Sequence, residues 1–375
     1  MERAIKTRIY PTDEQQELIN KTFGCCRFIY NKALERQIEC HKQEQKFVGK
    51  FEMCRWITEM KKENEWLAEV SVRALQFSVA HLESAYLKFF KGAGFPKFRS
   101  KHRKQSFTDN SNIRIEHHYV RVPKVGLMRT YERLDKTIKP NSITISMQAG
   151  MYFASIQYDD GKEPAKPNGG EPVGIDLGIT TLATLSDGTV IENPRHISKH
   201  EGKIKKLQRK MSQQKKGSNR RNVTKQKLVR VHMKVANCRK DYLHKATTMI
   251  TKSYGYVALE NLNFDGMKRN HKLAKAISDC GFYEFRRQLE YKAQWYGSKI
   301  AFIGRFEPSS KMCSTCGWIK KDLTLKDREW ECGQCEAKHD RDENAAKNIL
   351  VFSIAPAGSR EVDRVKQGNS LVDCQ

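Results

Sequence analysis

The sequence predicts a multidomain α+β protein, and three observations support this prediction. The chain has 375 residues, a length typical of two or three domains. Apolar residues alternate with period two at residues 4–10 and again over about 105–160, with helical periodicity between these segments. From residue 173 onward, strand and helix patterns alternate. We therefore expect a β-barrel-like unit interrupted by a helical insertion, followed by an α/β unit.

The first unit begins with a strand at residues 4–10. Thr12 and Gln15 have the spacing of a capping box, which predicts that a first helix begins there. A second helix is expected over residues 51–60 and a third behind Ser71, with their aromatic residues in the core. The later strands include a hairpin turned at Ala149-Gly150 and end in a Pro/Gly-rich linker at 159–170.

The second unit begins with a buried strand at residues 173–179, which carries an acid, Asp176, among apolar residues. An antiparallel meander follows around an Asp187-Gly188 turn. The remaining predicted elements are a strand at 256–260, a helix at 281–296, a strand at 300–303 and a final helix at 342–352.

The chain is strongly basic, with 69 Lys and Arg against 43 Asp and Glu and a net charge of +26. The excess is clustered, because residues 195–240 hold 17 Lys or Arg and a single acid, Glu201. Apolar residues recur there at helical spacing, so we expect a basic helical hairpin broken near residues 217–219. A solvated charged face is the alternative, but such a face usually mixes both signs of charge. The imbalance favours a surface that follows nucleic-acid phosphates.

Two protein classes are disfavoured. No run of about 18 apolar residues occurs, so no membrane-spanning helix is expected. The first residues lack the apolar core of a secretion signal. Seven of the 11 cysteines are scattered without pattern, which favours a reducing cytoplasm over a disulfide framework.

The other four cysteines form two pairs, Cys313/Cys316 and Cys332/Cys335, separated by 15 residues. Each pair places two thiolates on a tight turn, and this spacing is typical of a structural zinc ribbon over residues 307–338. A redox dithiol is the alternative for one isolated pair. Four thiolates leave no open coordination position, so the zinc is expected to be structural. His339 lies nearby and is not needed as a ligand.

Three acids occupy costly positions: Asp176 within an apolar strand, Glu260 at the end of another, and Asp342 at the start of a helix. Carboxylates gathered from separate elements repel each other unless they share cations. Two Mg²⁺ ions about 3.5–4 Å apart would support phosphodiester hydrolysis, with Asp176 bridging both. Each signal alone is weak. The carboxylate of Asp176 could hydrogen-bond to the backbone, and Asp342 could be a helix N-cap. The loop around Asp176 also resembles a phosphate loop of actin-like kinases.

The chain resembles the TnpB family of transposon-encoded, RNA-guided DNA endonucleases, which are related to type V CRISPR effectors. The resemblance covers nearly the whole chain. Its carriers are the four cysteines and the segments GIDLG at 174–178, LENL at 259–262, DRDENAAKNI at 340–349, FGCCRFIYN at 23–31 and FPKFRSK at 95–101.

The resemblance implies a wedge β-barrel over residues 1–10 and 96–165, with a helical recognition lobe inserted at 11–95. It also implies an RNase H-like RuvC nuclease domain over 172–306 and 339–357. That domain would contain the basic helical insertion at 195–250 and the zinc-ribbon module, followed by a flexible tail at 358–375. The catalytic acids would be Asp176, Glu260 and Asp342. Asp340 is the rival for the last role, but the family pattern places the acid two residues before Asn-Ala-Ala.

The resemblance also implies the partners: a guide RNA from the transposon end and a double-stranded target DNA, bound by a monomer in the cytoplasm of a bacterial or archaeal cell, in association with the nucleoid. Base pairing would select the target, and the protein would read a short adjacent motif. Gln76 and Thr108 are candidates for base contacts, although ordinary surface polar residues are nearly as good an explanation. Further candidate contacts to nucleic acid are Lys97, Arg99, Lys101, Arg103, Lys104 and Gln105.

Three functions are compatible with these patterns. The first is a Mg²⁺-dependent, RNA-guided DNA endonuclease that cleaves beside the adjacent motif. The second is an RNA-guided DNA-binding regulator that does not cut, against which the complete set of three acids argues. The third is a transposase or junction resolvase that uses the same metal chemistry without RNA.

Overall fold

The computed structural model describes residues 1–305, 307–324 and 326–354. The chain divides into two compact units, Met1–Glu163 and Pro164–Gln375, each of which is described by itself. The division falls inside the segment that its Pro/Gly-rich composition marks as a linker. The tail expected at 358–375 and the last three residues of the expected nuclease domain lie outside the described residues.

The first unit contains a seven-stranded antiparallel sheet with the order β2-β6-β7-β1-β5-β4-β3. β1 lies inside this sheet because it pairs with β7 on one side and with β5 on the other. Ala149 and Gly150 both have positive φ, 56° and 74°, as a tight hairpin turn requires, so the predicted β6–β7 hairpin is confirmed. The strands are β1 (Glu2–Tyr10), β2 (Gln105–Asp109), β3 (Arg114–Glu116), β4 (Tyr119–Val122), β5 (Gly126–Thr130), β6 (Pro140–Gln148) and β7 (Met151–Asp159).

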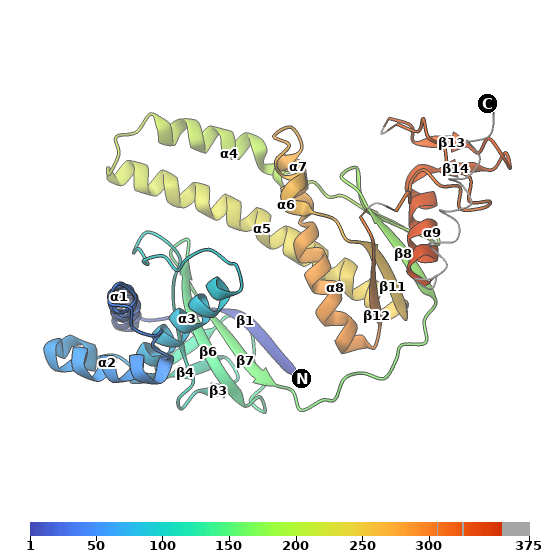
Figure 1. The fold of residues 1–375 in the computed structure, drawn as a ribbon. Helices are drawn as coiled ribbons and strands as arrows, with labels where there is room; N and C mark the ends of the chain where they lie inside the picture. Colours follow the sequence, from blue (N-terminus) through green and yellow to red (C-terminus); the bar gives the residue numbers. More distant parts are fainter. Residues whose placement is uncertain (306, 325, 355–375) are drawn as a thin grey trace. The chain divides into compact units, whose positions relative to one another are not determined.

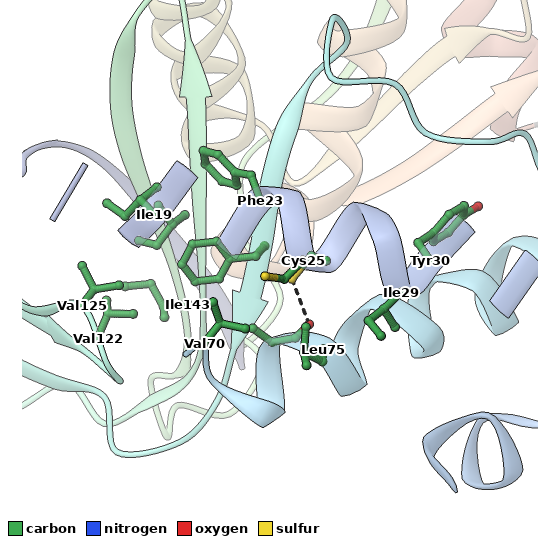
Figure 2. Packing of buried hydrophobic residues seen from close by; sticks show 14 of the residues in the cluster. Ile19, Phe23, Cys25, Ile29, Tyr30, Val70, Leu75, Val122, Val125 and Ile143 are labelled. Carbon is green, nitrogen blue, oxygen red and sulfur yellow. Dashed lines mark hydrogen bonds between the residues drawn. The ribbon is translucent and has the colours of Figure 1, made fainter. Parts of the chain in front are cut away.

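Three helices come between β1 and β2, namely α1 (Asp13–Lys42), α2 (Lys50–Glu63) and α3 (Val72–Phe90), with a short 3₁₀ helix, η1 (Glu65–Ala68). The capping box at the start of α1 is confirmed: the Thr12 hydroxyl accepts from Gln15 N at 3.3 Å, and Gln15 Oε1 accepts from Thr12 N at 3.1 Å. Figure 2 shows Ile19 and Phe23 of α1 in the same buried cluster as Ile143 of β6. This cluster joins the helices to the sheet.

The second unit contains a five-stranded mixed sheet with the order β10-β9-β8-β11-β12. β8, β9 and β10 form the predicted antiparallel meander, whereas β11 and β12 run parallel to β8. The chain therefore leaves the meander and returns on the other side of its first strand. The strands are β8 (Pro172–Leu177), β9 (Thr181–Leu185), β10 (Val190–Glu192), β11 (Tyr256–Glu260) and β12 (Lys299–Ile303).

Most of the helices of this unit lie between β10 and β12. Figure 1 shows α4 (His196–Ser212) and α5 (Asn219–Ser253) as a long hairpin. The predicted break is confirmed, since Gly217 has a φ of +85° and the Ser218 hydroxyl accepts from Arg221 N at the start of α5. An apolar seam, to which Ile204 and Leu228 belong, holds the two helices together. The shorter helices are α6 (Phe264–Met267), α7 (Ala274–Cys280) and α8 (Phe282–Tyr296).

The mixed sheet is covered by helices on both faces. The helix α9 (Arg341–Ile354) packs on the face opposite to that of α5 and α8. Val173 and Leu259 belong to a cluster that also includes residues of α5 and α8. Gly174 follows Val173 in β8 and Ala258 precedes Leu259 in β11, so both lie on the opposite face of the sheet. On that face Ala258 packs with Ile349 of α9. The cysteine module between β12 and α9 includes a two-stranded sheet, β13 (Glu329–Glu331) and β14 (Lys338–Asp340). Within the described residues, none of the helices is long and apolar enough to cross a membrane.

The contact between β8 and α9 generates the first prediction. A Cβ atom on Gly174 would lie 2.0 Å from the carbonyl oxygen of Ala346 and 2.8 Å from Leu350 N, so Gly174→Ala forces the helix off the strand. We expect a loss of about 1–3 kcal/mol or more in the free energy of unfolding, measured by chemical denaturation. Gly202→Ala is the matched control, because Gly202 lies in α4 with open space around its Cβ position. It should be neutral or stabilise by about 0.5–1 kcal/mol. Equal stability of the two variants would contradict the close packing.

Candidate nuclease site and zinc module

The ends of two parallel strands bring Asp176 and Glu260 to the same edge of the mixed sheet. Ile175 of β8 is paired with Leu259 of β11, and each acid is the next residue along its strand. Because side chains alternate along a strand, Asp176 lies on the face of Gly174, and Glu260 lies on the face of Ala258. This is the face that α9 covers. Both carboxylates are half-buried at the end of that face.

The third acid, Asp342, lies in the first turn of α9. Its neighbour Asp340 has a different task, because Asp340 Oδ1 accepts from the backbone N of Asp342 at 3.0 Å and of Glu343 at 2.9 Å. These are the bonds of a helix N-cap. The carboxylate of Asp342 instead pairs with Arg328, whose Nη1 lies 3.2 Å from its Oδ2. Arg328 also donates to the Thr180 hydroxyl at 3.3 Å, beyond the end of β8.

The charges of the other two acids act on Asp176. Burial is the largest cause of the raised pKa of Asp176, the charges of Glu260 and Asp342 add to it and Arg341 opposes it, and together they place this pKa at about 7. Burial also raises the pKa of Glu260, against the hydrogen bond that Ser309 donates to its Oε1. Half-buried anions held together by packing provide the hard oxygen ligands that a divalent cation prefers. Among the described residues, the group gathered closely enough to hold a metal ion is the set of cysteines described next, and the three carboxylates do not form such a group.

The four cysteines Cys313, Cys316, Cys332 and Cys335 converge as the spacing predicts, with all four sulfur atoms within 4.8 Å of one another. Cys313 and Cys335 are 3.7 Å apart at Sγ, and Cys316 and Cys332 are 3.5 Å apart. The apolar cluster beside them is small and consists of the buried Cys313, Leu323, Trp330 and Cys332 with Trp318 packed against them. Four convergent thiols on so small a core fit a tetrahedral structural Zn²⁺ that folds the module.

His339 lies closer to this cluster than a surface histidine would. Its Nε2 is 3.1 Å from the Sγ of Cys313, and its ring packs on Trp330 with centroids 4.8 Å apart. The imidazole is therefore placed to hydrogen-bond a ligand sulfur, as groups around metal ligands commonly do.

Three polar residues that the sequence analysis did not single out connect the zinc module to the acids. Asn348 of α9 donates to the carbonyl oxygens of Ser309, at 2.7 Å, and Met312, at 2.6 Å. Asn344 also donates to Met312 O at 2.8 Å, and its Oδ1 accepts from Ser314 N at 2.9 Å. Ser309 in turn donates to Glu260. The signal that could have identified the two asparagines is their spacing, because Asn344 and Asn348 are four residues apart on the same buried helix face as Ala345 and Ala346.

Several of the predicted nucleic-acid residues make contacts within the first unit. Thr108 is buried and its hydroxyl is 2.9 Å from that of Thr144 on the neighbouring strand. Gln105 accepts from Arg27 and donates to three carbonyl groups of the preceding loop. The Arg99 guanidinium lies 3.8 Å from the centre of the Tyr30 ring, and burial lowers its pKa. Gln76 is half-buried on α3 and accepts from Arg73 at 3.0 Å.

The other predicted contacts, Lys97, Lys101, Arg103 and Lys104, are exposed between α3 and β2. The hairpin of α4 and α5 also exposes a row of cations. Its two acids are paired with lysines, Glu201 with both Lys205 at 2.8 Å and Lys275 at 2.7 Å, and Asp241 with Lys245 at 2.8 Å. Most of the positive charge on this hairpin therefore remains available to an external polyanion.

Three family models match successive parts of the chain. A model described as "Probable transposase", OrfB_IS605, matches residues 155–271, and a model of the TNB domain of Cas12f1-like proteins matches residues 282–349. A helix-turn-helix model of the same OrfB_IS605 group matches residues 1–46. In the structure these 46 residues contain strand β1 and the single long helix α1.

The chain is also similar to curated proteins over almost its full length. It is 38% identical to a "Putative RNA-guided DNA endonuclease" of Streptomyces pristinaespiralis, over 99% of this chain and 94% of that protein. It is 33% identical to the "Putative RNA-guided DNA endonuclease InsQ" of Escherichia coli K12, over 98% of this chain and 96% of that protein. A solved structure of CasPhi-2 (Cas12j) bound to crRNA matches with a TM-score of 0.48 and 9% identity, over 95% of this chain and 98% of that chain. On the evidence of the full-length relatives and the matching models, this chain belongs to the TnpB (OrfB_IS605) family.

Proposed function

We propose that the protein is an RNA-guided, Mg²⁺-dependent DNA endonuclease of a transposon, which cleaves target DNA next to a short adjacent motif. The observation that carries this proposal is the placement of Asp176 and Glu260 at the same edge of the sheet, with Asp342 in the first turn of the helix that packs on β8, so that three acids come from three separate elements. Such a set is unfavourable in an apoprotein and favourable around cations. The names of the full-length relatives support the same activity.

The order and direction of the strands in the second unit support an RNase H-like, RuvC-type nuclease domain. A three-stranded antiparallel meander extends into two parallel strands, and the two acids lie near the ends of the neighbouring strands β8 and β11. The α4–α5 hairpin is then the basic insertion, and the cysteine module is the target-nucleic-acid-binding module. In the first unit, the seven-stranded sheet corresponds to the wedge domain, and α1, α2 and α3 correspond to the recognition lobe.

Asp176, Glu260 and Asp342 are the residues that would hold the two Mg²⁺ ions. When bound, Mg²⁺ would supply activation of a water molecule and stabilisation of the leaving oxygen of the phosphodiester. Ser309 keeps one oxygen of Glu260 oriented through its hydrogen bond. Arg328 balances the charge of Asp342 in the free protein, so the Arg328–Asp342 pair has to open when a cation binds there.

The positive charge would bind the phosphates of the guide RNA and of both DNA strands. We assign this role to the exposed cations of the α4–α5 hairpin and to Lys97, Lys101, Arg103 and Lys104. A direct base contact by Gln76 or Thr108 stays a prediction. Thr108 would have to exchange its bond to Thr144, and Gln76 its bond to Arg73.

The first prediction of this proposal separates Asp342 from its rival. Asp342→Asn should abolish cleavage of guided plasmid but leave nucleic-acid binding intact, because a metal ligand is lost while the phosphate contacts remain. Asp340→Asn is the matched control, since asparagine also caps helices and loses one charge. It should keep cutting. The reverse result would move the catalytic role to Asp340. Asp176→Ala and Glu260→Ala should behave like Asp342→Asn.

The same plasmid assay separates the proposed function from its alternatives. If the unmodified protein binds guided DNA without cutting it, the protein is a regulator. Cleavage by protein that lacks RNA, after treatment with RNase, would identify a transposase or resolvase instead.

A second prediction uses the raised pKa of Asp176. Because the pKa of about 7 exceeds the ordinary value of 3.8, the folded protein holds this proton more tightly than the unfolded chain. Metal-free protein should therefore lose stability as the pH rises from about 4 to about 7, the interval in which the unfolded chain has released this proton and the folded protein still holds it. Asp176→Asn should raise the melting temperature in EDTA at about pH 8 and change it less at about pH 5. The exposed Asp265→Asn is the control and should show no such pH dependence. Mg²⁺ should stabilise the unmodified protein at the higher pH, and equal melting curves for all three proteins would refute the coupling.

The third prediction concerns zinc. Cys316→Ser should lower zinc content and soluble yield, because a three-ligand site cannot hold the small module together. Cys238→Ser, on α5, is the control for loss of a thiol. His339→Ala should retain one zinc per chain by elemental analysis, since four thiolates complete the coordination. Full zinc content in Cys316→Ser, or loss of zinc from His339→Ala, would mean that the ligand set includes the imidazole.

A further inference from the structure

A cationic pocket in the first unit lies apart from the acids and the cysteines. It has a volume of about 660 Å³ and is bordered by the end of α2, the start of α3 and the β4–β5 turn. Four of its lining residues are cations, namely Lys61, Arg73, Arg121 and Lys124. No Asp or Glu occurs among the described residues that line it. The concave shape distinguishes this pocket from the exposed cations of the α4–α5 hairpin.

The four cations lack the partners that would normally balance them. Within the described part of the chain, none of them forms an ion pair with a carboxylate. Arg73 donates to the neutral amide oxygen of Gln76. Arg121 lies directly opposite Arg114 on the neighbouring strand. Like charges placed opposite each other destabilise a sheet, so an external anion would relieve this arrangement.

The N-terminus of α3 adds donors to the same pocket. The first backbone N–H groups of a helix have no partner within the helix, and the helix dipole favours an anion there. Ser71 occupies the N-cap position of this 19-residue helix, yet its side chain makes no capping bond. The third helix begins directly after Ser71, as the sequence predicts, but the Ser71 hydroxyl does not cap it. Ser71 lines the pocket, is 9% exposed, and its hydroxyl has no hydrogen-bond partner among the described residues.

The loop after β2, which forms another wall of the pocket, is held in place by a buried carboxylate. Asp109 is fully buried, and its Oδ1 accepts from the backbone N of Ser111 at 2.8 Å and from its hydroxyl at 2.7 Å. Ser111 and the next residue, Asn112, line the pocket. The carboxylate therefore fixes the pocket wall, and the Ser111 donors attenuate its charge.

We propose that this pocket binds one phosphate group of a nucleic-acid backbone, held by the α3 N-terminus, Ser71 and the four cations. The proposal rests on the proposed function, because it assigns a position to part of the nucleic acid. A phosphate fixed here would set the register of Gln76, which lies five residues beyond Ser71 and is bonded to Arg73. Phosphate contacts position a protein on its target, and base contacts then select the sequence. DNA and RNA share this chemistry, so the experiment must distinguish them.

The main test replaces two pocket cations in the full-length protein. Arg121→Gln/Lys124→Gln should weaken binding about tenfold at physiological salt and reduce the salt dependence of the binding constant by about one phosphate contact. Lys42→Gln/Lys136→Gln is the matched control, because it removes the same charge from exposed sites outside the pocket. Binding is measured by fluorescence anisotropy in EDTA, with a labelled DNA duplex in one arm and the copurifying RNA in the other. EDTA prevents cleavage, so failure of the nuclease proposal leaves this readout intact.

Ser71→Asp distinguishes a local effect on the pocket from misfolding, because it should stabilise the fold and weaken binding at the same time. An aspartate at the N-cap should bond the free N–H groups and raise the melting temperature of the protein. The same carboxylate would occupy the anion position and weaken binding. A loss on DNA only or on RNA only supports the pocket and identifies its ligand. The proposal is overturned if Ser71→Asp binds both probes as tightly as the unmodified protein, or if the pocket and control double variants weaken binding equally.

Discussion

The close approach of α9 to β8 is the constraint on which the proposed active site depends. Gly174 leaves no room for a Cβ atom beneath the carbonyl of Ala346, so the helix lies directly on the strand. Asp342, one turn before Ala346, is thereby placed near Asp176, which lies two residues beyond Gly174. Burial, and then repulsion from the other two carboxylates, raises the pKa of Asp176. Packing energy from the apolar faces of the sheet holds these anions together against that repulsion.

The cysteine module is connected by hydrogen bonds to α9 and to Glu260. Asn344 and Asn348 use the buried face of α9 to hold the backbone around the first cysteine pair, and Ser309 continues the network to Glu260. A metal that orders the module therefore also orders the chain segment that contacts one of the acids. A zinc ion bound by these cysteines would thus have a physical connection to the proposed chemistry, in which it would take no part.

Positive charge is used in two different ways in this protein. The α4–α5 hairpin displays exposed cations that can follow any phosphate backbone, which is a long-range and salt-sensitive attraction. The pocket at the start of α3 gathers cations, helix N–H groups and a free hydroxyl in a concave space. A hairpin surface of this kind accelerates association, whereas a pocket of this kind fixes position.

The sequence alone determined most of the elements and the four cysteines that converge in the structure. Period-two and helical patterns located the strands, the basic hairpin and its break, and the cysteine spacing predicted the four-sulfur cluster. These features are local, because side-chain periodicity and ligand spacing follow from the geometry of a strand, a helix or a turn. The resemblance to a known family, which the comparisons confirm, came from the same short motifs.

Only the tertiary structure decided how individual polar side chains are engaged. It made Asp340 the cap of α9, turned Thr108 toward Thr144, placed Arg99 on Tyr30, and left the Ser71 hydroxyl without a capping bond to α3. It also joined Asn348 to Ser309, which is 39 residues away along the chain. A hydrogen bond between distant segments depends on which donor and acceptor the fold brings together. Residue type and spacing along the chain do not specify that pairing.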